Sequence, residues 1–127
     1  MIGGSASLLT AITDINQLSL PELHKETIMI MIDKLRDFPI VKDIILFGSC
    51  ARQSVSEHSD IDVALVVAEA LHPEDEWRID YSIRNWNANI ACDVVFLPEE
   101  VFEREVKGDT IIRPILHEGI RLSGLLR

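Results

Sequence analysis

The chain has 127 residues, of which 47% are hydrophobic and 26% charged, so it can form one hydrophobic core but is too short for two. Its net charge of −9 repels phosphate backbones, which argues against sequence-independent binding of nucleic acid. It lacks both the run of ~18 apolar residues that crosses a membrane and the features of a signal peptide, so we expect a cytoplasmic protein.

The first 19 residues are small and polar, and we expect them to be flexible or to become ordered against a partner. Residues 20–127 are predicted to form a single domain. Ser19, Pro21 and Glu22 are typical of a helix start with Ser as the cap, and the helix should continue to about Asp37. Its predicted inner face consists of Leu23, Ile28, Ile32 and Leu35. The histidines expected at the surface or at helix ends are His24, His72 and His117.

Three apolar runs are predicted to be strands: residues 41–47, 60–67 and 90–97. Helices are predicted at residues 73–87, 98–108 and 110–117, and residues 120–122 are predicted to add a short edge strand. This order of elements predicts an α/β (α+β) domain in which helices pack on a small mixed sheet.

The most informative motif joins the first two predicted strands. Gly48 and Ser49 form a turn after the first strand, ten residues follow, and Asp60 and Asp62 open the second strand. Alternation along a strand puts the two carboxylates on one face, roughly 6.5 to 7 Å apart, a spacing suited to divalent cations. Gly48 allows a close approach of the backbone to a phosphate, and Ser49 offers an N–H and a hydroxyl.

Taken alone, a Gly-Ser pair can be only a turn, and an Asp-x-Asp triplet can arise by chance. Residues 63–67, however, are continuously apolar, as in a strand covered on both faces. A carboxylate at the head of such a strand, at Asp62, is costly unless something compensates it. Asp93 is a third acidic residue within an apolar run, so spacing and strand context together favour a site over chance.

The pattern resembles the DNA polymerase beta-like nucleotidyltransferases, most closely their minimal, MNT-type members, over about residues 40–122. The resemblance implies the polymerase beta-like fold, with Gly48 and Ser49 binding the triphosphate of ATP and two Mg²⁺ ions held by three carboxylates. Those metal ligands and catalytic residues are Asp60, Asp62 and Asp93. Arg52 is a candidate phosphate ligand, with a surface salt bridge to Glu57 or Asp60 as its alternative. The family's Ala-Arg-Gly after this turn is Ala-Arg-Gln here, ending at Gln53.

The resemblance further implies an antitoxin that transfers AMP from ATP to a tyrosine of a HEPN-type RNase toxin. The apolar excess on the first predicted helix favours a homo- or hetero-oligomer. Two alternatives stay open: a small-molecule nucleotidyltransferase acting as a homodimer, and a non-catalytic antitoxin that neutralises its toxin by binding. His58 is expected to be a solvated loop histidine, and Cys50 and Cys92 free thiols that serve packing.

Overall fold

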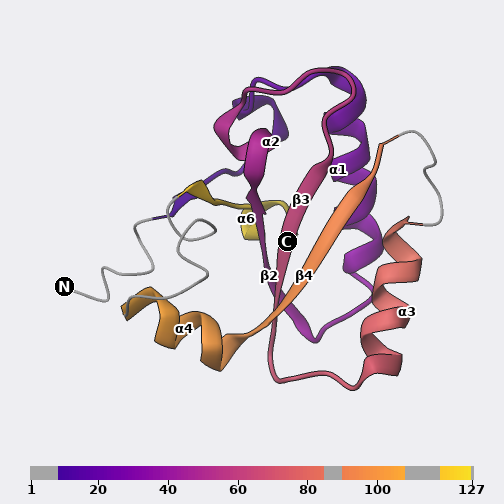
Figure 1. Ribbon diagram of the computed structural model, residues 1–127, viewed down its shortest axis with the longest axis vertical. Coiled ribbons are helices and arrows are strands. Elements are labelled where there is room, and N and C mark those ends of the chain that lie inside the picture. Colours follow the sequence, from indigo (N-terminus) through magenta and orange to yellow (C-terminus); the bar gives the residue numbers. More distant parts are fainter. Residues whose placement is uncertain (1–8, 85–89, 108–117, 127) are drawn as a thin grey trace.

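The computed structural model describes residues 9–84, 90–107 and 118–126, arranged as a mixed five-stranded sheet with helices packed on it (Figure 1). The predicted fold class is confirmed. In chain order the elements are β1 (Thr10–Ala11), the 3-10 helix η2 (Ile15–Gln17), α1 (Glu22–Leu35), β2 (Val41–Phe47), α2 (Gly48–Arg52), β3 (Ile61–Val67), α3 (Pro73–Arg84), β4 (Cys92–Pro98), α4 (Glu99–Lys107), β5 (Ile120–Arg121) and α6 (Ser123–Leu126).

The sheet has the order β1-β5-β2-β3-β4. Its centre is β2 and β3, which pair antiparallel, while β4 runs parallel to β3. The bounds of β2 agree with the prediction, β3 begins one residue later than predicted, and β4 is displaced by one or two residues. Every residue of β3 except Asp62 is buried, as expected for a strand covered on both faces.

Alternation along the central strands separates two apolar clusters. The larger joins Leu46 and Val63 to residues of α1 and α3, and the smaller joins Ile45 and Ala64 to Phe102 of α4. Thus α1 and α3 cover one face and α4 packs on the other, an arrangement that is visible in Figure 1. By the same alternation, Asp62 belongs to the α4 face, at the end where β3 begins.

Helix α1 differs from its prediction at its start. The helix begins at Glu22 with Pro21 as the N-cap and without a side-chain cap hydrogen bond, so Ser19 lies outside the helix. The backbone N–H of Ser19 donates to the Gln53 side chain. On the predicted inner face, Leu23 is 45% exposed. His24, which was expected at the surface or a helix end, is completely buried although it is the third residue of the helix.

Strand β5 was predicted as an edge strand, and this is wrong. It lies between β2 and β1, because Thr10–Ala11 pairs with it in parallel and takes the edge position. Within the predicted N-terminal segment, Leu9, Ile12 and Leu18 are buried. Arg121 of β5 forms an ion pair of 2.6 Å with Asp43, whose side chain is 5% exposed. This pair ties β5 to the centre of the sheet.

Two predictions lie outside the described residues: the helix at residues 110–117 and the last turn of the helix that ends near residue 87. In the described part of the chain, no helix combines the length and apolarity needed to cross a membrane.

Candidate active site

The residues of the sequence motif meet at the end of the sheet where β2 stops and β3 begins. Phe47, the last residue of β2, pairs with Asp62, and Gly48 follows it with φ of 70°. A Cβ added to Gly48 would lie 2.3 Å from Oδ2 of Asp62. Only glycine combines this left-handed backbone with so close an approach to the carboxylate. The start of α2 is therefore fitted to the Asp62 side chain.

Asp62 and Asp93 are register partners in the parallel pair β3–β4. Burial, the charge of Asp93 and a hydrogen bond between the two side chains raise the pKa of Asp62 above its ordinary value. The charge of Asp60 acts in the same direction, and Arg52 acts against it. Two carboxyl groups in contact repel each other when both are ionised, and a shared proton or a bound cation relieves this repulsion. The pair therefore has the oxygen donors and the electrostatic need that suit a hard divalent cation.

Asp60 lies near this pair, and its charge acts on Asp62, but it does not form a three-carboxylate cluster with the pair. It is exposed and lies one residue before β3. Among residues 9–84, 90–107 and 118–126, no three His, Cys, Asp or Glu side chains are close enough together to hold a metal ion. Of the three predicted carboxylates, the structure thus brings two into contact and leaves the third as a neighbour that has to turn inward to complete a site.

Ser49 and Arg52 both lie on α2. Ser49 is in the first turn, partly exposed next to Gly48. Arg52 forms an ion pair of 2.9 Å with Glu118, and not with either acidic residue considered from the sequence. Both side chains are substantially exposed, so the pair contributes about 0–1 kcal/mol, and Arg52 can exchange it for another anion at little cost.

Gln53 has a backbone conformation that favours glycine. It ends α2 in the left-handed conformation, with φ of 56° and ψ of 33°, which costs a non-glycine residue about 1–2 kcal/mol. Its side-chain Oε1 accepts a hydrogen bond of 2.6 Å from the backbone N–H of Ser19. This contact offsets part of the strain, so Gln53 keeps the turn that a glycine would adopt freely.

The two cysteines lie close to the carboxylates but are unsuited to nucleophilic chemistry. Both are buried free thiols. Burial, followed by the charge of Asp62, raises the pKa of Cys50 to about 11, and burial raises the pKa of Cys92 to about 11. Because the thiolate is the reactive form, both are inert at neutral pH. This agrees with their predicted packing role.

One residue near the site was missed from the sequence. His24 donates from Nε2 to the backbone oxygen of Ser59, the residue before Asp60, over 2.8 Å. A signal was available, because His24 stands four residues before Ile28 and therefore on the inner stripe of α1.

Comparison with known proteins places this geometry in context. The family model described as "Polymerase beta, Nucleotidyltransferase" matches residues 30–121, which include all the site residues named above except His24. Comparison with curated proteins gave no match.

Solved structures that resemble the chain include two toxin–antitoxin proteins. One is a mutant of the MntA-HpeT toxin–antitoxin, 24% identical, with a TM-score of 0.50 over 72% of this chain and 68% of that chain. The other is a toxin–antitoxin with AMP-PNP, 22% identical, with a TM-score of 0.53 over 75% of this chain and 70% of that chain. At these identities the likeness shows a shared fold.

Proposed function

The chain belongs to the polymerase beta nucleotidyltransferase family, and from this premise we propose that it is a metal-dependent nucleotidyltransferase. Its donor is ATP, its product is an AMP ester on a protein hydroxyl, and its acceptor is a tyrosine of a HEPN-type RNase toxin. The protein thereby acts as the antitoxin of its partner.

The observation that carries the proposal is the contact of Asp62 with Asp93 beneath Gly48. Asp93 raises the pKa of the adjacent Asp62, which means that the two charges repel each other and destabilise the fold. A cation bound between them would remove this cost. Asp62 and Asp93 would hold a divalent cation such as Mg²⁺, with Asp60 turning inward as a further ligand. When bound, such a metal neutralises phosphate charge and lowers the pKa of an attacking hydroxyl.

The remaining steps fall to the chain's own groups. The backbone N–H groups of Gly48 and Ser49, at the start of α2, donate to phosphate oxygens whose charge grows as pyrophosphate leaves. Arg52 releases Glu118 and binds a phosphate through its planar guanidinium. Asp93 is exposed, so it can accept the proton of the incoming hydroxyl while Asp62 stays at the buried side of the pair.

The toxin partner is proposed by analogy of fold. Both structural neighbours are toxin–antitoxin proteins, and one of them was solved with AMP-PNP, an ATP analogue. The same fold in this chain supports an ATP donor and a toxin partner.

The test is to incubate the purified chain with Mg²⁺, ATP and the product of its neighbouring gene, and to measure the intact mass of that partner. We expect one or more AMP masses on the partner, lost with Asp60→Ala/Asp62→Ala. The matched control is Asp33→Ala, which removes a highly exposed carboxylate of α1 and should leave transfer unchanged. A tight, neutralising complex without AMP, unaffected by Asp60→Ala/Asp62→Ala, would instead establish a non-catalytic antitoxin.

A further inference from the structure

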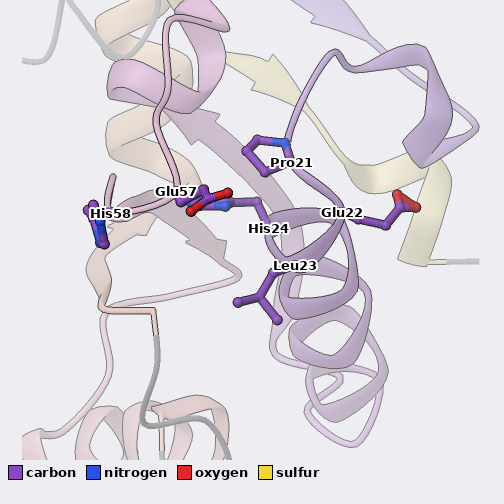
Figure 2. A pocket seen from close by; sticks show the side chains of 6 residues that line it. All are labelled: Pro21, Glu22, Leu23, His24, Glu57 and His58. Carbon is purple, nitrogen blue, oxygen red and sulfur yellow. The ribbon is translucent and has the colours of Figure 1, made fainter.

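The first turn of α1 places a buried histidine against the loop that leads into the candidate active site. His24 has no exposed surface. Figure 2 shows its side chain projecting from α1 toward the loop that carries Glu57, at a pocket of about 440 Å³. His58 of the same loop points away from α1 in this view and is exposed. Of these two histidines, His24 is the one that lies between α1 and the loop.

The hydrogen bond of His24 fixes how its ring is protonated. Nε2 lies 2.8 Å from the carbonyl oxygen of Ser59, which can only accept, so Nε2 carries the proton. Nδ1 is buried and has no hydrogen-bond partner among the described residues. A leucine would fill the same space without burying an unpaired nitrogen, which is unfavourable. The one advantage of His24 over a leucine at this position is therefore the N–H that it donates to the loop.

That bond acts on one of the two peptide units that flank Asp60. The carbonyl of Ser59 belongs to the unit that also contains the Asp60 nitrogen, and His24 holds it. In the next unit, the Asp60 carbonyl accepts from the Cys50 thiol at 3.5 Å, and the N–H of Ile61 donates to the Ala91 carbonyl at 2.9 Å. With both units anchored, the direction of the Asp60 side chain from its Cα is set.

We propose that His24 is a positioning residue, whose Nε2–H holds the backbone from which the Asp60 side chain turns toward the Asp62–Asp93 pair when a metal binds. The role rests on the proposed function, because Asp60 needs a fixed orientation only if it serves a ligand. Outer contacts that orient metal ligands typically change metal affinity by 10–100-fold when removed.

The test compares three variants of the full chain. His24→Leu keeps the volume and removes the donor. His24→Gln restores a donor, since the glutamine amide nitrogen can reach the same carbonyl. His58→Leu removes the exposed neighbouring histidine as the matched control. Mn²⁺ is the probe, with its affinity measured by electron paramagnetic resonance, and hydrogen exchange is followed in a peptide that covers residues 56–61.

We expect His24→Leu to weaken Mn²⁺ binding by about tenfold or more and to speed exchange in the 56–61 peptide. His24→Gln should return both values most of the way to those of the unmodified chain, and His58→Leu should leave both unchanged. A purely structural role of His24 would lower the unfolding midpoint in urea without changing the Mn²⁺ affinity of the folded protein, and that result would overturn the inference.

Failure of the proposed function is distinguishable from failure of this inference. If the unmodified chain binds no Mn²⁺, the metal-dependent function is wrong and the positioning role falls with it. If the unmodified chain binds Mn²⁺ and His24→Leu binds it equally well, the positioning role alone is refuted. If His24→Leu fails to fold, His24→Gln can be compared with His24→Asn instead. The asparagine amide is too short to reach the Ser59 carbonyl, so this pair also compares a variant with the donor and a variant without it.

Discussion

The close approach of Gly48 to Asp62 can be tested by replacing Gly48 with alanine. At φ of 70°, a non-glycine residue costs about 1–2 kcal/mol. The new Cβ would also lie 2.3 Å from Oδ2 of Asp62. Asp62 must then leave its rotamer, at a further ~0.5–1.5 kcal/mol. We expect Gly48→Ala to lower the free energy of unfolding by about 2–3 kcal/mol.

Urea unfolding followed by circular dichroism measures this loss, and a double-mutant cycle with Asp62→Ala separates its two causes. In the Asp62→Ala background the clashing oxygen is gone, while the backbone strain at Gly48 persists. Gly48→Ala should then cost only about 1–2 kcal/mol. Equal losses in both backgrounds would refute the contact between Gly48 and the carboxylate.

Three further predictions concern Asp62, Asp43 and the two cysteines. Asp62→Asn should raise the free energy of unfolding at pH 7 by about 0.5 kcal/mol, a small effect because solvent screens this partly exposed group. Since the folded-state pKa of Asp62 is raised, the gain should disappear in urea titrations below the ordinary value of 3.8, and a loss of stability at pH 7 would contradict the account. Asp43→Ala should cost about 2–3 kcal/mol in the same assay, less than a fully buried pair because Arg121 is 28% exposed, and adding Arg121→Ala should cost little more. Cys50 and Cys92, with pKa values raised to about 11, should react with a disulfide reagent at pH 8 only as fast as the protein unfolds, so rapid labelling of the native chain would refute their burial.

Local sequence signals predicted those parts of the fold that depend on local physics. Strand β2 ends where predicted because the apolar run of residues 44–47 stops at Gly48, where the backbone turns left-handed. The mixed sheet likewise follows from apolar runs that alternate with amphipathic helices. These features depend on residues within a few positions of one another, and such signals can be read from the chain.

The features that were wrong or missed depend on partners far along the chain. The backbone N–H of Ser19 bonds to the side chain of Gln53, 34 residues away. Arg52 pairs with Glu118, 66 residues away. Strand β5 is internal because the two-residue strand β1, with no recognisable pattern of its own, pairs with it. No periodicity within a short window encodes such contacts.

The candidate site also combines features that the sequence predicts with one that depends on distant residues. The spacing of the sequence motif predicted Gly48, Ser49, Asp60 and Asp62 as site residues. The direct contact of Asp62 with Asp93 follows from the parallel register of β3 and β4, which cannot be read from the sequence. The roles of these residues in metal and nucleotide binding remain predictions to be tested.

The central claim, that this chain transfers a nucleotidyl group, is tested most directly with ATP labelled at either the α- or the γ-phosphate. Incubation with Mg²⁺ and the proposed partner toxin should place the α-label on the partner and release the γ-label as pyrophosphate. Asp62→Asn/Asp93→Asn should abolish both events. Transfer of the γ-label to protein, or undiminished α-label transfer by that double variant, would contradict the account.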